Sequence, residues 1–322
     1  MVIDYCLYLV TWLLVISSKM KVFDLIILGA GPAGITSAVY AVRKQLDFLV
    51  ISLDVGGQTA ISGDIENYTG YQFITGPELT LKFQEHMESF GTKVNLSEEA
   101  RDIKKEGKLI KVLTNKYEYL TKSLIVATGK SPQALEVEGE NEFKNKGLTY
   151  CATCDGPLFR DKKVAIIGGG NSGLEATLQM MKISPKVYLI NIAERLKGDP
   201  IMVDKVKASP QVEIWNNSRV KKVYGKDFVK GIEVEREGKL HKLELEGVFV
   251  EIGLRANSKL AGILDKNQKG EIIVPSHNKP NIEGIFAAGD VTNVPEKQII
   301  IACGEGSKAC LLAFKYLSTH KF

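Results

Sequence analysis

Residues 22–34 read VFDLIILGAGPAG, an apolar run that ends in a glycine-rich turn. The pattern predicts a buried strand at Val22–Leu28, a helix from about Ile35 to Lys44 and a second strand at Phe48–Ile51. At this spacing the first glycine permits a tight turn, the second lets the backbone approach a pyrophosphate, and the third lets the helix pack closely on the strand. The sequence therefore predicts a dinucleotide-binding βαβ unit near the start of the chain.

The same pattern returns in the middle of the chain. A predicted strand at Lys163–Ile167 is followed by GGGNSG at residues 168–173, a helix to about Lys182 and a strand at Lys186–Ile190. A helix N-terminus that follows such a loop favours bound anions, so this unit also predicts a nucleotide site. Its candidate pyrophosphate-binding residues are Gly168, Gly170, Asn171, Ser172 and Gly173.

Further segments predict the remaining elements of the first unit, which lie before and after the second unit in the chain. Leu109–Thr114 and Tyr117–Tyr119 predict a hairpin, Leu124–Gly129 predicts a buried strand that ends in a turn, and Gly304–Tyr316 predicts a terminal helix. GIFAAGD at residues 284–290 predicts a further strand and turn of the first unit. We therefore expect an α/β fold of two Rossmann-like, three-layer nucleotide-binding domains, the second inserted in the first. The expected bounds are 1–20 for an apolar N-terminal extension, 21–129 and 256–322 for the first domain, and 130–255 for the second.

Composition limits the partners of this chain. Its 44% hydrophobic and 25% charged residues are typical of a globular protein, and 322 residues suggest about two domains. The net charge of +4 is spread in short lysine pairs, so nucleic acid is not expected. Residues 2–16 are mostly apolar, but Asp4 interrupts them and they are shorter than the roughly 18–20 residues of a bilayer span. We expect no membrane partner, and either Met20 as the natural start or an unessential tail, although a membrane-surface anchor remains an alternative.

Residues 151–155 read CATCD, two cysteines at Cys-x-x-Cys spacing with a carboxylate beside the second. Such a turn can stabilise the thiolate of one sulfur, and Asp155 could carry the protons that move when a disulfide becomes a dithiol. A zinc site would need four ligands, but Cys6, Cys303 and Cys310 are isolated, so we expect no metal. These three have no evident role, and Cys310 is expected in a core. The sequence predicts a redox dithiol in a reducing cytoplasm, with candidate catalytic residues Cys151, Cys154 and Asp155.

The two glycine loops and CATCDG at residues 151–156 together resemble the low-molecular-weight thioredoxin reductases, from about Val22 to Tyr316. The resemblance implies FAD in the first domain, a nicotinamide cofactor in the second, and a homodimer. It implies that Cys154 faces the flavin, that Cys151 attacks a partner disulfide and that Asp155 is the general acid. It also implies rotation of the second domain about joints near residues 129–132 and 253–257. The expected FAD-binding residues are Gly29, Gly31, Pro32, Ala33, Gly34, Asp54, Gly56, Gly57, Gln58, Asn67, Thr128, Gly129, Gly289, Asp290, Lys297, Gln298 and Ile299.

The segment NIAERLK at residues 191–197 lies where such a domain chooses its nicotinamide cofactor. An acid there would bind the ribose of NAD, and arginines would bind the 2′-phosphate of NADP. NADPH-using members of the family carry His-Arg-Arg at residues 191–193, where this chain has Asn-Ile-Ala, and a further arginine at the position of Lys197. Each lost charge-assisted hydrogen bond is worth about 1.5–3 kcal/mol, so we expect NADH to be favoured over NADPH. The candidate residues here are Asn191, Arg195 and Lys197, of which the last two could recover part of the loss.

Three functions remain open from the sequence. The first is an FAD-dependent thioredoxin-disulfide reductase, which passes electrons from NAD(P)H through Cys151–Cys154 to thioredoxin or a glutaredoxin-like protein. The second is the NADH-dependent reductase component of a peroxiredoxin or alkyl hydroperoxide system, or a reductase fed by a donor other than NAD(P)H. Residues 191–197 and 294–302 look closer to that NADH-using flavoprotein, but it has an acid at position 191 and an extra N-terminal thioredoxin-like module that residues 1–20 are too short to supply. The third is a flavin-binding redox sensor, which the dithiol and its neighbouring carboxylate disfavour.

Overall fold

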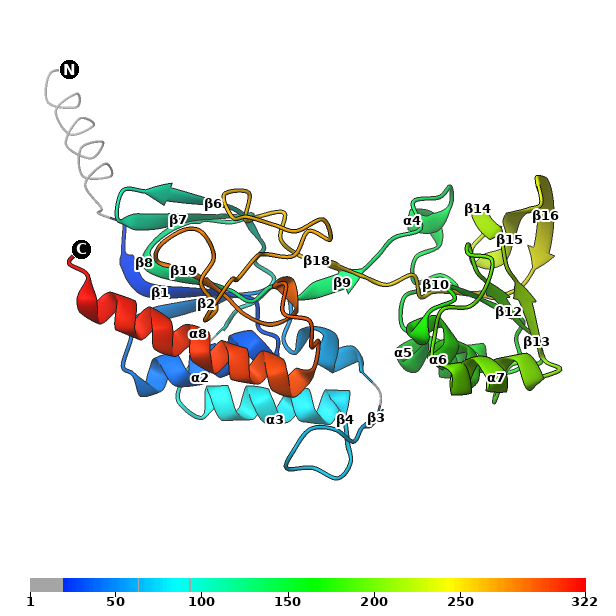
Figure 1. Cartoon of the computed structure of the whole chain (residues 1–322), viewed down its shortest axis with the longest axis horizontal. Coiled ribbons are helices and arrows are strands. Elements are labelled where there is room, and N and C mark those ends of the chain that lie inside the picture. The colour runs from blue at the N-terminus through cyan, green and yellow to red at the C-terminus, as the bar shows by residue number, and fades with distance from the viewer. Residues whose placement is uncertain (1–19, 63, 93) are drawn as a thin grey trace, which may run out of the picture. The chain divides into compact units, whose positions relative to one another are not determined.

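The computed structural model describes residues 20–62, 64–92 and 94–322, apart from the side chains of Asp64 and Cys154. The expectations for residues 1–19, including Cys6, lie outside the described residues. The chain divides into two compact units. Figure 1 colours the chain by residue number, so the segments of each unit can be located along the colour bar. Of the described residues, unit 1 comprises those from 20 to 57, Lys82–Gly129 and Ser258–Phe322, and unit 2 comprises those of Gln58–Leu81 and Lys130–Asn257. The assignment of FAD and NAD(P) to domains of the expected bounds stays a prediction.

A mixed sheet forms the centre of unit 1. Among the described residues it contains seven strands, with β19 (Ile285–Ala287) and β1 both paired in parallel to β8. Because β1 and β19 pair with the same end of β8, they lie on opposite sides of it. On the side of β19, the first residues of β8 pair antiparallel with β7, which confirms the predicted hairpin, and β6 extends β7 in a second antiparallel pair. The remaining order is β5-β2-β1-β8-β7-β6, with bounds Val94–Asn95, Phe48–Ile51, Val22–Leu28, Glu118–Val126, Leu109–Thr114 and Ala100–Glu106.

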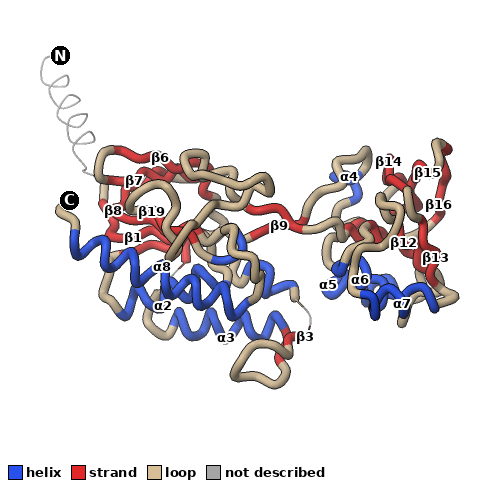
Figure 2. The backbone as a smooth tube through the Cα atoms, viewed as in Figure 1, coloured by secondary structure: helices blue, strands red, loops and turns tan. Residues whose placement is uncertain are grey.

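Successive residues of the central strand β1 point to opposite faces of this sheet, and both faces are covered. Leu25 and Ile27 pack toward α2 (Pro32–Arg43) and α8 (Ile299–Thr319), the helices that Figure 2 shows beside the sheet. Ile26 and Leu28 pack instead on the irregular segment around residues 260–274. A buried strand flanked by two packed layers explains why β1 is a continuous apolar run rather than an alternating one.

Several element bounds differ from the expectations. The first helix begins at Pro32 rather than near Ile35, because proline is preset for the first helical turn and needs no N–H partner there. The terminal helix α8 is longer than the predicted Gly304–Tyr316. The two segments expected on either side of residue 121 form one strand, β8. The sequence did not predict β6, since its polar residues alternate with a single fully buried one, Ile103.

Unit 2 is built on a parallel sheet with the order β10-β17-β11-β12-β13. The bounds are Leu148–Thr149, Gly247–Val250, Val164–Ile167, Val187–Ile190 and Val212–Trp215. The helices α6 (Asn171–Met180) and α7 (Pro200–Ala208) pack on one face of this sheet. An antiparallel sheet of β14 (Ser218–Gly225), β15 (Val229–Arg236) and β16 (Lys239–Glu244) packs on the other face. The expected α/β class with two nucleotide-binding sheets is thus confirmed, although the sequence missed this third layer.

Shorter elements complete the described chain. Strands β9 (Lys130–Pro132) and β18 (Leu254–Ala256) pair with each other where the sequence predicts the joints. Two short strands, β3 (Asp64–Ile65) and β4 (Ile74–Thr75), precede α3 (Gly76–Glu88). The remaining short helices are η1 (Gly57–Ile61), α4 (Glu140–Phe143), α5 (Ala152–Asp155), η2 (Gly156–Phe159) and η3 (Gly289–Val291). In the part of the chain that the structure describes, no helix is long and apolar enough to cross a bilayer.

Candidate functional site

The first glycine loop, residues 29–34, joins β1 to α2 in unit 1. Gly29 has a φ of +105°, and a side chain there would overlap the carbonyl oxygen of Ala127 at the end of β8. A side chain at Gly34 would overlap the carbonyl oxygen of Gly29, so this glycine lets α2 start directly against the end of β1. No side chain caps the helix start at Gly31 and Pro32. The free N–H groups of this helix end can therefore bind a pyrophosphate.

Segments that are distant in sequence surround this loop. The N–H of Gly56 donates to the carbonyl oxygen of Ala30 at 2.7 Å. A Cβ placed on Gly57 would lie 3.6 Å from the Cα of Gly31, and one on Gly29 would lie 3.2 Å from the Cα of Thr128. A Cβ on Gly289 would likewise lie 3.1 Å from the Cβ of Ala33. Backbone from four segments thus converges where the sequence predicts a dinucleotide.

Most of the predicted FAD-binding residues share unit 1. They are Gly29, Gly31, Pro32, Ala33, Gly34, Asp54, Gly56, Gly57, Thr128, Gly129, Gly289, Asp290, Lys297, Gln298 and Ile299, whereas Gln58 and Asn67 belong to the segment grouped with unit 2. Asp54, the predicted ribose acid, is exposed in the turn after β2. Ser52 is buried nearby, and its hydroxyl accepts a hydrogen bond from the N–H of Ala30 at 3.1 Å. Ser52 therefore supports the loop rather than presenting its hydroxyl to a ligand.

Two charged side chains hold the turn that carries Asp290. Lys297 donates to the carbonyl oxygen of Thr292 at 2.5 Å and lies 3.7 Å from the carboxylate of Glu271. Glu305, a buried residue of α8, accepts a hydrogen bond from the N–H of Gly289 at 3.2 Å. Sequence reasoning missed Glu305, because nothing local marks a helix residue that will face this turn.

The dithiol segment lies at α5 in unit 2. The sulfur of Cys151 takes part in a disulfide bond. The side chain of Cys154 lies outside what the structure describes, so the pairing of these two cysteines stays a prediction. The hydroxyl of Thr149 donates to the carboxylate of Asp155 and accepts from the N–H of Cys151, the latter at 3.2 Å. Thr149, which the sequence did not single out, therefore couples the predicted proton carrier to the backbone of the redox cysteine.

Two further cysteines, Cys303 and Cys310, are buried and are not disulfide-bonded. Burial raises the pKa of the Cys310 thiol to about 12, and the charge of Lys44 opposes this shift. A thiol with such a pKa supplies almost no thiolate at neutral pH. The prediction that Cys310 belongs to a core is confirmed, since it packs in the cluster between α2, α8 and the sheet.

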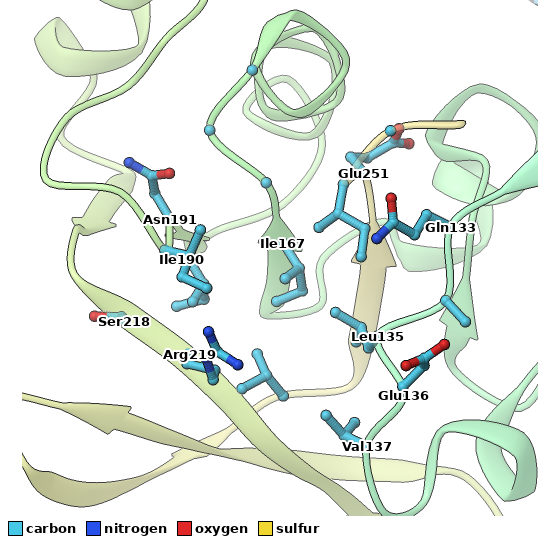
Figure 3. Close-up of a pocket in the computed structure, with 18 of the residues that line it drawn as sticks. Gln133, Leu135, Glu136, Val137, Ile167, Ile190, Asn191, Ser218, Arg219 and Glu251 are labelled. Carbon is cyan, nitrogen blue, oxygen red and sulfur yellow. The ribbon is translucent and has the colours of Figure 1, made fainter. Parts of the chain in front are cut away.

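The second glycine loop opens onto a cavity of about 920 Å³ in unit 2, shown in Figure 3. Gly168 has a φ of +133°, and a side chain at Gly173 would overlap the carbonyl oxygen of Gly168, so this loop repeats the geometry of the first. At Gly170 a Cβ would meet no atom within 4 Å, which leaves the backbone open to a ligand. The volume is within the range of about 300–1,000 Å³ that is typical of ligand pockets. Of the predicted NAD(P)-binding residues, those that line the cavity are Gly168, Gly170, Asn171, Ser172 and Asn191.

The side chain of Asn191 is occupied by its own surroundings. It is buried, and its amide nitrogen donates to the carbonyl oxygen of Ala193 at 3.0 Å and to the side-chain oxygen of Asn216 at 2.8 Å. Its oxygen accepts from the N–H of Ala193 at 3.3 Å. Asn191 therefore shapes the end of β12. The other two predicted residues of this segment, Arg195 and Lys197, are exposed and are not among the residues that line the cavity.

The cavity contains charged residues that sequence reasoning missed. Arg219, from the start of β14, lies on the same side as Ile190 and Asn191, whereas Glu136 and Glu251 lie on the opposite side (Figure 3). No sequence motif marks Arg219, because it reaches the cavity only through the packing of the antiparallel sheet on β12.

Glu251 connects the cavity with the dithiol segment. It follows β17, lines the cavity, and its carboxylate accepts a hydrogen bond from the N–H of Ala152 in α5. The carbonyl oxygen of Ala152 in turn accepts from the side chain of Gln179 at 3.0 Å. Burial raises the pKa of Glu251 to about 7; the hydrogen bond from Ala152 opposes this shift and the nearby charge of Glu175 adds to it. Glu251 thus changes its charge near neutral pH.

Two α/β units that each carry a glycine loop at a strand–helix junction, one of them with a disulfide-bonded cysteine, define a class of flavoprotein oxidoreductases that act on disulfides. The chain belongs to the pyridine nucleotide-disulphide oxidoreductase family, whose model matches residues 23–306. It is similar to a solved thioredoxin reductase from Lactococcus lactis, with a TM-score of 0.82 and 32% identity, over 92% of this chain and 100% of that one.

Curated relatives of this chain carry other names. It is 41% identical over 298 residues to a protein named NADH dehydrogenase from Ferdinandcohnia aciditolerans, which covers 92% of this chain and 57% of that protein. It is 40% identical over 308 residues to the F subunit of alkyl hydroperoxide reductase from Escherichia coli, which covers 93% of this chain and 59% of that protein. The chain therefore spans less than two thirds of the length of these relatives.

Proposed function

We propose that this chain is a thioredoxin-disulfide reductase that binds FAD, oxidises NAD(P)H and reduces a thioredoxin-like or glutaredoxin-like protein as a homodimer. The observation that carries the proposal is the position of the disulfide-bonded Cys151. Its segment is tied to Asp155 through Thr149 and to the nucleotide cavity through Ala152 and Glu251. The likeness to a thioredoxin reductase over the whole length of that structure supports the same function.

The first loop fits FAD. The glycines at residues 29–34 leave backbone exposed at an uncapped helix end, and the turn at Gly289 is held against this loop by Glu305. A bound flavin supplies a two-electron carrier between a hydride donor and a disulfide. In unit 2 the loop at residues 168–173 would hold the pyrophosphate of the nicotinamide cofactor.

The sulfur chemistry follows from the residues of the dithiol segment. In the reduced enzyme the Cys151 thiolate attacks one sulfur of the partner disulfide and forms a mixed disulfide, and the partner's other sulfur leaves as a thiolate that takes a proton from Asp155. The Cys154 thiolate then attacks the Cys151 sulfur, releases the partner's remaining sulfur and closes the enzyme disulfide. Thr149 keeps Asp155 beside this segment throughout, since its hydroxyl donates to the carboxylate.

The experiment is an anaerobic titration of the purified protein with NADH and, separately, NADPH, followed by flavin absorbance and then by addition of an oxidised thioredoxin. We expect a bound flavin that bleaches with donor and regains its colour with thioredoxin. Cys151→Ser should still bleach but should not pass electrons to thioredoxin, while Thr153→Ala, a change at an exposed position between the cysteines, should behave as the wild type. Normal thioredoxin reduction by Cys151→Ser, or purified protein without flavin, contradicts the proposal.

A second candidate is the reductase of a peroxide-reducing system. The relative named as the F subunit of alkyl hydroperoxide reductase, at 40% identity, favours it. The two candidates differ in the protein disulfide that accepts the electrons. Reduction of a peroxiredoxin by this chain in the absence of any thioredoxin or glutaredoxin would select the second, and a strict requirement for thioredoxin would select the first.

A further inference from the structure

The cavity of unit 2 has a cationic residue at the place where a nicotinamide cofactor is distinguished from its 2′-phosphorylated form. In a βαβ nucleotide domain, the ribose of the adenosine half lies at the end of the second strand, here β12. Arg219 lines the cavity on the same side as Ile190 and Asn191, the end of that strand (Figure 3). Arg219 also lines a smaller adjoining cavity of about 250 Å³ together with Ile192.

The guanidinium of Arg219 is free to bind an anion. Arg219 is exposed, and within residues 20–322 as described no hydrogen bond or ion pair engages its side chain. It stands directly opposite Glu235 in the β14–β15 pair, but that carboxylate is taken by Lys221 at 2.5 Å. The largest cause that lowers the pKa of Glu235 is this hydrogen bond from Lys221. The charge of Arg219 also lowers this pKa, but only through space.

An irregularity in the sheet explains this arrangement. The register of β14 against β15 shifts between Val220 and Lys222, so Lys221 is an extra residue in a β-bulge. A bulge of this kind changes the direction of neighbouring side chains and is common beside binding sites. Lys221 thereby forms the ion pair with Glu235, and the guanidinium of Arg219 is left to interact with a ligand in the cavity.

The cations expected from the sequence do not have this position. Arg195 and Lys197 follow β12 but are exposed and do not line the cavity. Asn191, at the place of the usual ribose-binding acid, has both amide hydrogens bound to neighbouring oxygens. Position 191 at the end of β12 therefore presents an amide and not a carboxylate, and the cation on this side of the cavity comes from a different strand, β14. Glu235 and Glu237 line the smaller adjoining cavity with Arg219.

We propose that Arg219 is the residue that selects the nicotinamide cofactor, by binding the 2′-phosphate of NADPH. The inference rests on the proposed function, and it replaces the expected preference for NADH with a preference for NADPH. The planar guanidinium suits a phosphate because it can donate two parallel hydrogen bonds. One charge-assisted hydrogen bond at an exposed position corresponds to about tenfold in affinity.

The test uses adenosine nucleotides that differ only at the 2′ position and need neither flavin nor turnover. Binding of 2′,5′-ADP and of 5′-AMP to the full chain is measured by isothermal titration calorimetry. We expect the wild type to bind 2′,5′-ADP about tenfold more tightly than 5′-AMP. Arg219→Gln should remove this difference while binding 5′-AMP as the wild type does, and Arg219→Lys should keep only part of it. Arg195→Gln, which removes the same charge outside the cavity, is the matched control and should keep the whole difference.

Three results would overturn the inference. The first is a wild type that binds the two nucleotides equally, and the second is an Arg219→Gln variant that weakens both by the same factor. The third is loss of the 2′-phosphate preference in Arg195→Gln instead. The proposed function is judged separately, because a chain that reduces thioredoxin with either donor and shows no effect of Arg219→Gln retains that function and refutes only the inference.

Discussion

Replacing Glu251 by glutamine should change how the stability of unit 2 depends on pH. Glu251 is partly buried where it follows β17 and contacts α5, and burial raises its pKa from an ordinary 4.5 to about 7. Glutamine has nearly the same shape and keeps an oxygen that can accept the hydrogen bond from Ala152. The variant therefore removes the titration of this group while it preserves the contact.

The size and sign of the effect follow from proton linkage. Between pH 4.5 and 7 the folded protein holds a proton on Glu251 that the unfolded chain has released, so the free energy of unfolding falls as pH rises. One pKa unit corresponds to about 1.4 kcal/mol, so the loss reaches about 3 kcal/mol by pH 8. Glu251→Gln lacks this loss. We expect the two proteins to be similar near pH 4.5 and the variant to be more stable by up to about 3 kcal/mol at pH 8.

The assay is urea unfolding at several pH values between 5 and 8, followed by tryptophan fluorescence. Trp215 is buried in β13 of unit 2 and reports on that unit, and a Trp12→Phe background removes the only other tryptophan. The matched control is Glu244→Gln, which removes a carboxylate at an exposed position of β16.

The reasoning is refuted if the difference in unfolding free energy between Glu251→Gln and the wild type is the same at pH 5 and pH 8. It is also refuted if Glu244→Gln shows the same dependence on pH, because the effect would then come from net charge and not from a buried acid.

Three other expectations concern single residues. The added Cβ of Gly173→Ala would overlap the carbonyl oxygen of Gly168, so this variant should lower the unfolding free energy by about 3 kcal/mol or more in a urea titration. The Cβ of Gly170→Ala would meet no atom within 4 Å. This second variant should therefore leave stability unchanged and weaken 5′-AMP binding. Asn191→Asp replaces an amide that donates two hydrogen bonds and should cost about 1–3 kcal/mol in the same titration; a stable variant that binds NADH more tightly would show that this position contacts ribose instead. Burial raises the pKa of the Cys310 thiol to about 12, so Cys310 should resist alkylation by iodoacetamide in the native protein at pH 8 and should react after unfolding. Mass spectrometry that finds Cys310 modified in the native protein would contradict its burial.

The sequence alone determined the two βαβ units, because their signals are local. The apolar runs predicted β1, β2, β11 and β12 within a residue of their bounds, since a strand buried on both faces needs apolar side chains at successive positions. Residues 29 and 168 must be glycine because their φ angles are positive. Residues 34 and 173 must be glycine because a side chain there would overlap the carbonyl oxygen of the first glycine of the same loop, five residues earlier. The spacing of CATCD likewise marked the redox segment, and the structure finds Cys151 in a disulfide.

Only the tertiary structure decided which side chains face the nucleotide cavity. Arg219 and Glu251 reach it because β14 packs across the sheet and β17 lies beside β11, contacts between segments that are far apart in sequence. The same packing occupies the amide of Asn191 and leaves Arg195 and Lys197 outside the cavity. Burial and neighbouring charge also set the pKa of Glu251, and neither can be read from residue identity. A local pattern can place a loop or a strand, but long-range packing chooses the charges that surround a bound nucleotide.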